Sequence, residues 1–172
     1  MTSTPALFDF LDRSHQELQR QLVALRRLVG AVADDSLDAA GRDELKRTIA
    51  WFNREARQHH LDEEHHVFPP LLQSTDANVV QTTLRLRQDH GWIEENWLEL
   101  EPSLEAAAGG YSWFDRDTLA QGVEVFEQLY IDHLTLEESL AYPEASKRLA
   151  QTDTTGMGRE MAARRARLKK ES

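Results

Sequence analysis

Cysteine is absent from this sequence of 172 residues. A chain without cysteine forms no disulfide bond, no thiolate-ligated zinc site and no cysteine-ligated iron–sulfur cluster. Any metal ion that this protein binds is therefore held by histidine, by carboxylates or by backbone oxygen atoms.

Long apolar runs are also missing. The first ten residues lack the basic segment and following apolar stretch of a secretory signal. No stretch approaches the roughly 20 apolar residues that a membrane span needs. The sequence therefore predicts a cytoplasmic protein with no membrane partner.

Positive charge is in the minority: 20 Lys and Arg stand against 30 Asp and Glu, and the formal net charge is −10. This balance argues against nucleic acid as a partner. Basic residues do gather near the C-terminus, where we interpret them as a solvent-exposed helix face. These residues are Arg159, Arg164, Arg165, Arg167, Lys169 and Lys170.

No segment sustains the alternation of apolar and polar residues that is typical of strands. Apolar residues instead recur every three or four positions, which predicts helices. The expected helices cover about 4–30, 38–69, 79–109, 112–142 and 155–170, with Thr4 and Pro5 as the first N-terminal cap. Pro69 and Pro143 are expected to end the second and fourth helices.

These elements predict an all-α fold: an up-and-down antiparallel four-helix bundle with a short additional C-terminal helix. The polar breaks are too short to hold a second domain. We therefore expect residues 1–172 to form one domain, with the bundle at about 5–145 and the extra helix at about 155–170.

Histidines occupy unusual positions on the apolar stripes of the long helices. Four of the seven histidines lie on these stripes, one on each helix, and two glutamates share them. Burying such groups without partners is costly, and a shared metal ion would satisfy them. The pattern predicts a metal site in the core made by His15, His59, His90, His133, Glu63 and Glu137.

An internal repeat supports this metal site. HHLDEEHHVFPP, at 59–70, and HLTLEESLAYPE, at 133–144, align without a gap. Each contains a His, a Glu four positions later and a Pro six positions beyond that Glu. Positions i and i+4 share a helix face, so His59 with Glu63 and His133 with Glu137 can each reach one metal ion.

Neighbouring residues leave alternatives open. His60 with Glu64 is also an i, i+4 pair, but it lies about one position off the stripe. Glu138 is the corresponding alternative to Glu137. We assign His60, Glu64 and His65 as residues that flank the site.

The combination resembles the hemerythrin-like, or HHE cation-binding, family over about residues 11–143. The matching positions are His15, His59 and Glu63 followed by Pro69, His90 after Asp89, and His133 and Glu137 followed by Pro143. Ferritin-like proteins fit less well, because their paired Glu-xx-His units have one counterpart here, Glu63 with His66.

This resemblance implies two non-haem iron ions, joined by an oxo or hydroxo bridge and by the carboxylates of Glu63 and Glu137, with the four histidines as terminal ligands. Oxygen-carrying hemerythrins have a second histidine four positions after the third-helix histidine, where this chain has Glu94. Glu94 is either a seventh ligand or a solvated residue, and its presence argues against reversible oxygen carriage. Zinc and manganese also suit this ligand set.

The expected function is to bind or sense a small ligand: oxygen, nitric oxide or peroxide. An electron donor is a further expected partner. Catalase-like disproportionation of peroxide at the iron ions is one alternative, and iron storage or delivery for the repair of iron centres is another. The sequence assigns no catalytic residue and does not define the oligomeric state.

Overall fold

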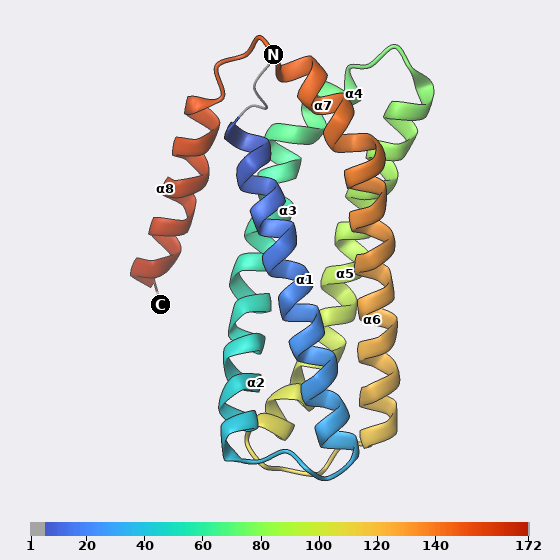
Figure 1. Cartoon of the computed structure of the whole chain (residues 1–172), viewed down its shortest axis with the longest axis vertical. Helices are drawn as coiled ribbons and strands as arrows, with labels where there is room; N and C mark the ends of the chain where they lie inside the picture. The colour runs from blue at the N-terminus through green and yellow to red at the C-terminus, as the bar shows by residue number, and fades with distance from the viewer. Residues whose placement is uncertain (1–5, 172) are drawn as a thin grey trace.

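The computed structural model describes residues 6–171, and nearly all of them are helical (Figure 1). The helices are α1 (Ala6–Ala33), α2 (Ala39–Trp51), η1 (Phe52–Ala56), α3 (Arg57–Asp62), η2 (Glu63–Val67), α4 (Phe68–Leu72), α5 (Ala77–Ala108), α6 (Arg116–Leu136), η3 (Glu137–Ala141), α7 (Tyr142–Leu149) and α8 (Thr155–Glu171), where η marks π-helical turns. No strand occurs between residues 6 and 171. The prediction of an all-α chain is confirmed for these residues, and the cap predicted at Thr4 and Pro5 lies outside them.

Four helical columns form the body of the protein. The first is α1, the second runs unbroken from α2 to α4, the third is α5, and the fourth runs unbroken from α6 to α7. Both α1 and α5 pack against α2 and α6, so each column has two neighbours. In Figure 1 the columns lie side by side, with α8 outside them. Every helix between residues 6 and 171 is too short or too polar to span a lipid bilayer.

An aspartate precedes each of the three later columns. The side chains of Asp38, Asp76 and Asp115 accept hydrogen bonds from backbone amides two or three residues further along. Amides in a first helical turn have no partner within the helix, so these caps stabilise the column starts.

Two columns continue through prolines that were expected to end them. The second column runs past Pro69 to Leu72, and the fourth runs past Pro143 to Leu149. The predicted helix ends at these prolines are therefore wrong.

Wider π-helical turns explain why the helices continue. Proline has no amide hydrogen and crowds the carbonyl four residues earlier, which for Pro69 belongs to His65 within η2. In η2 the amide of Phe68 donates to the carbonyl of Glu63, five residues back. Such a turn has one more residue than an α-helical turn and accommodates the proline. The turn η3 precedes Pro143 in the same way.

The interior consists of two hydrophobic clusters separated by a polar layer. On α1, Leu11 belongs to one cluster and Leu18 to the other, with the buried His15 between them. The same order holds on α5 around His90. Apolar packing on both sides thus fixes the level at which the polar side chains meet.

The additional helix α8 docks on α3 through buried charges. Asp62 is fully buried and accepts two hydrogen bonds from Arg165, at 3.0 and 2.6 Å. Arg164 Nη1 lies 3.0 Å from Asp62 Oδ1 and also donates to the carbonyl of Gln58. A buried carboxylate is stable only when it is paired, and Arg164 and Arg165 supply the partners of Asp62. The interpretation of these two arginines as solvent-exposed is therefore wrong.

Truncating a core leucine of α1 tests the packing. Leu25 is fully buried, whereas Val23 on the same helix is 65% exposed. We expect Leu25→Ala to lower the free energy of unfolding by about 2–5 kcal/mol, and Val23→Ala to change it by no more than about 0.5 kcal/mol. Urea unfolding measures both, and equal losses in the two variants would contradict this packing.

Candidate metal centre

Six buried side chains from all four columns meet in the polar layer. The column of α1 supplies His15, the second column His59 and Glu63, α5 supplies His90, and the fourth column His133 and Glu137. None of them is more than 4% exposed. The side chains that the stripes and the repeat selected are thus brought together.

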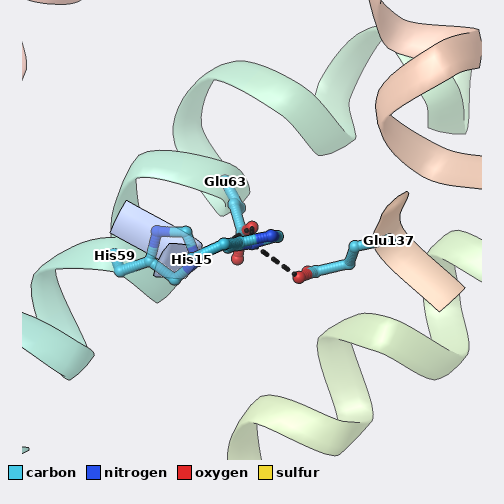
Figure 2. Close-up of side chains that lie close together, drawn as sticks. All are labelled: His15, His59, Glu63 and Glu137. Carbon is cyan, nitrogen blue, oxygen red and sulfur yellow. Dashed lines mark ion pairs between the residues drawn. The ribbon is translucent and has the colours of Figure 1, made fainter. Parts of the chain in front are cut away.

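These six side chains form two groups with metal-ligand spacing. One consists of His15, His59, Glu63 and Glu137, and the other of Glu63, His90, His133 and Glu137. Within each group the ligand atoms lie within 4.8 Å of one another. The two carboxylates belong to both groups, which is the arrangement that two bridging carboxylates require. Figure 2 shows the first group, with the carboxylates directed toward His15.

Each imidazole turns its Nε2 atom toward a carboxylate. In the first group, Nε2 of His59 lies 3.3 Å from Glu63 Oε1, and Nε2 of His15 lies 3.3 Å from Glu137 Oε2. In the second group, Nε2 of His90 lies 3.2 Å from Glu63 Oε2, and Nε2 of His133 lies 3.0 Å from Glu137 Oε1. The site therefore offers one inward nitrogen per histidine.

Several of these inward atoms are buried without a hydrogen-bond partner. They are Nε2 of His59, His90 and His133, Oε2 of Glu63, and both oxygen atoms of Glu137. Unpaired buried polar atoms cost free energy, and native proteins satisfy nearly all of them. Imidazole nitrogen and carboxylate oxygen are ligands that iron, zinc and manganese accept, so the donor set fits metal ions.

Carboxylates lie behind three of the four imidazoles. Nδ1 of His15 donates to Glu138 at 3.0 Å, and Nδ1 of His90 donates to Glu64 at 2.8 Å. Asp89 Oδ2 lies 3.7 Å from Nδ1 of His133. Such contacts hold a metal-ligating ring in one tautomer and orientation.

The structure therefore gives separate roles to neighbouring carboxylates that the sequence left as alternatives. Glu64 and Glu138 support histidines, while Glu63 and Glu137 face the interior. The contact of Asp89 with a histidine was not predicted from the sequence. Its position, directly before His90, carries no spacing signal of its own.

A tyrosine that sequence reasoning left without a role also touches the cluster. Tyr142 donates a short hydrogen bond from its hydroxyl group to Glu63, and this hydroxyl lies 2.8 Å from His15 Nε2. Its ring stacks on His15 at 4.8 Å. In the repeat Tyr142 corresponds to Phe68, which stacks on His90 at 5.4 Å. The repeat itself contained this signal.

Glu94 is not part of either group. Its carboxylate lies 3.2 Å from Nδ1 of His60, and its side chain is 41% exposed. His60 is buried, stacks on His90 at 4.0 Å and lies with Nε2 at 3.4 Å from the hydroxyl of Tyr130. Glu94 thus partners a histidine beside the cluster.

Another group with ligand-like spacing lies at the surface and consists of His65, His66 and Glu160. Arg164 donates two hydrogen bonds to the carboxylate of Glu160, at 3.0 and 2.8 Å. An arginine on this carboxylate repels a cation, so the group serves to attach α8.

Burial and neighbouring carboxylates oppose each other in setting the histidine charges. Burial lowers the pKa of His15, but hydrogen bonds and charges from Glu137 and Glu63 outweigh it and raise this pKa to about 10. Burial also lowers the pKa of His133, but the charges of Glu137 and Glu63 and hydrogen bonds to Asp89 and Glu137 together outweigh it and raise this pKa to about 10. Burial dominates at His59 and lowers its pKa to about 3.

Comparison with known proteins agrees with this geometry. A family model described as the hemerythrin HHE cation binding domain matches residues 6–145, which contain all four columns up to α7 but not α8. An uncharacterized protein of Haemophilus influenzae is 30% identical over 158 residues, which cover 91% of this chain and 88% of that protein.

Without metal, the stability of the protein should depend on pH in both directions. The raised pKa values of His15 and His133 give stability that is present below about pH 6.5 and is lost as the pH rises toward 10. The lowered pKa of His59 gives stability that is lost as the pH falls from about 6.5 toward 3. We expect the unfolding free energy in the presence of a chelator to be highest near pH 6.5. Urea unfolding across the pH range measures it, and a steady rise up to pH 9 would contradict the pKa assignments.

Proposed function

Because the chain belongs to the hemerythrin HHE cation-binding domain family, we propose that it holds two non-haem iron ions and binds or senses a small ligand: oxygen, nitric oxide or peroxide. The observation that carries this proposal is the sharing of two buried carboxylates by two histidine pairs. We further propose a cytoplasmic location, one domain in the chain, and the up-and-down antiparallel order of the four columns.

In this proposal the two histidine pairs bind different ions. His15 and His59 would hold one ion, His90 and His133 would hold the other, and Glu63 and Glu137 would contribute to both. Glu94 as a further ligand stays a prediction. In the structure its carboxylate lies on His60 and is not part of either group.

Iron ions bound here would supply redox chemistry and positions that a small ligand can occupy. The six side chains offer four nitrogen and four oxygen atoms, fewer than the roughly twelve positions of two six-coordinate ions. The hydrophobic clusters on both sides exclude bulk water from this layer. Glu138, Glu64 and Asp89 orient the imidazoles, and the hydroxyl of Tyr142 holds Glu63.

Burial supports retention of the ions over their delivery to other proteins. All six side chains are at most 4% exposed, and they come from four columns that pack on each other. Release would require the columns to separate locally, which is slower than release from a surface site. This favours a resident centre over an iron carrier.

Iron analysis of histidine variants tests the two-ion assignment. We expect the wild-type protein purified with iron to hold about two ions per chain, and His59→Ala and His133→Ala to hold about one each. An optical spectrum should show oxo-to-iron absorption in the wild type and lose it in both variants.

The control for this experiment is His65→Ala, because His65 is 49% exposed and lies outside both groups. It should keep the wild-type iron content and spectrum. Finding one tightly held zinc ion and no iron in the wild type would overturn the proposal of two iron ions.

Ligand binding and peroxide turnover can be separated with the same samples. We expect nitric oxide to change the optical spectrum of the iron-loaded wild type. The change should be far smaller in His59→Ala, because this variant lacks one ion. Oxygen release from added peroxide is measured in parallel with an electrode. Sustained oxygen release by the wild type that is lost in His59→Ala would favour a catalase-like function over a binding function.

A further inference from the structure

A tyrosine hydroxyl group lies among the polar atoms of the candidate centre. Tyr142, the first residue of α7, is only 5% exposed. Its hydroxyl group donates a short hydrogen bond to Oε1 of Glu63, and the hydroxyl oxygen lies 2.8 Å from Nε2 of His15. Both partners belong to the group of candidate ligands drawn in Figure 2. The hydroxyl oxygen is therefore in contact with two side chains that are expected to bind the same ion.

The spacing of this oxygen is that of a ligand atom. Nε2 of His15 and Oε1 of Glu63 lie 3.6 Å apart, and the hydroxyl oxygen of Tyr142 is closer to each of them than they are to each other. Bonds of about 2.1 Å from a metal ion to nitrogen and oxygen place adjacent ligand atoms about 3 Å apart. An ion bound by His15 and Glu63 would therefore have the hydroxyl oxygen within reach.

The hydrogen bonds of Tyr142 indicate how its oxygen is directed when an ion is bound. The hydroxyl group has one hydrogen atom, which it donates to Glu63. In the contact with His15, Nε2 is therefore the donor and the hydroxyl oxygen the acceptor. An imidazole that binds an ion through Nε2 carries no hydrogen on that atom, because the nitrogen lone pair forms the bond. Once an ion takes the place of that hydrogen, a lone pair of the Tyr142 oxygen faces the ion.

Stacking holds the ring of Tyr142 in place, and this stacking does not need the hydroxyl group. The ring lies 4.8 Å from that of His15 with 21° between their planes, and it meets the ring of Phe8 edge-on at 5.8 Å. At the corresponding position of the repeat, Phe68 stacks on His90 at 5.4 Å and 23°. An aromatic ring without an oxygen atom is thus sufficient for packing at this position.

We propose that Tyr142 is a ligand of the ion held by His15 and His59 and binds this ion through its phenolate oxygen. Coordination forms a bond between this oxygen and the ion and breaks the O–H bond, and the proton leaves to solvent, as it does from other groups that ligate metals. The inference rests on the proposed function for the presence of the ion. It adds Tyr142 to the four side chains of that group.

Resonance Raman spectroscopy of the iron-loaded protein tests this assignment. A phenolate bound to iron(III) gives a charge-transfer band in the visible range, and excitation into this band enhances the vibrations of the tyrosine ring. We expect these vibrations in the wild type, and we expect them to shift when the protein is produced with ring-deuterated tyrosine. Tyr142→Phe should lose the band and the vibrations. It should keep the circular dichroism of the wild type, because Phe68 occupies the equivalent position.

The chain contains two other tyrosines, which supply matched control variants. Tyr130 is also buried, but its hydroxyl oxygen lies 3.4 Å from Nε2 of His60, outside both ligand groups. Tyr111 is 68% exposed. Tyr130→Phe and Tyr111→Phe should therefore keep the charge-transfer band and the ring vibrations of the wild type.

Iron content is measured on the same samples and reports on the proposed function separately. Two iron ions in a wild type without tyrosine vibrations, or vibrations that survive Tyr142→Phe, would overturn the assignment of Tyr142 and leave the two-ion proposal standing. A tyrosine that only holds Glu63 by a hydrogen bond gives this result.

A wild type that holds zinc and no iron would overturn the proposed function, and zinc then serves as the probe of Tyr142. Zinc added to the chelator-treated protein should produce the ultraviolet difference spectrum of a phenolate, and Tyr142→Phe should lack it. An identical difference spectrum in the variant, or none in the wild type, would overturn the assignment. A wild type that binds neither metal would overturn both proposals.

Discussion

The rest of this structure depends on the ionisable groups that are buried at one level of the helical bundle. Four imidazoles and two carboxylates lie there almost without solvent contact. Buried charges are tolerated only when other charges, hydrogen bonds or metal ions satisfy them. The surrounding contacts follow from this requirement: carboxylates behind the imidazoles, a tyrosine hydroxyl on Glu63, and apolar clusters that fix the level from both sides.

Periodicity was sufficient to predict the columns and the residues that meet between them. A histidine that replaces an apolar residue on a stripe has its direction set by the packing of that stripe, as for His15 and His90. The stripe and the repeat favoured Glu63 over Glu64, and the structure gives these two carboxylates separate roles. The face of a helix is thus readable from spacing alone.

Spacing does not determine what a side chain at the edge of a stripe contacts. Glu94 shares a helix face with His90, yet its carboxylate lies on His60 of another column, a contact that depends on tertiary packing. The ends predicted at Pro69 and Pro143 failed because each proline follows a π-helical turn, which the spacing of apolar residues does not reveal. Arg164 and Arg165 of α8 looked solvent-exposed because their partner, Asp62, is distant in sequence and buried.

The two repeated units supply corresponding side chains around the centre, but the two halves are not equivalent. Phe68 stacks on His90 in one half, and Tyr142 stacks on His15 in the other, where its hydroxyl also reaches Glu63. A cation beside His15 would therefore have a phenol oxygen in its vicinity that its neighbour lacks. Asp89 adds a second difference, because it lies near His133 and no carboxylate of residues 6–171 lies in that position behind His59. Two chemically identical ions placed here would therefore differ in affinity and in reduction potential. One of two ions bound here would then fill its place, or change its oxidation state, before the other.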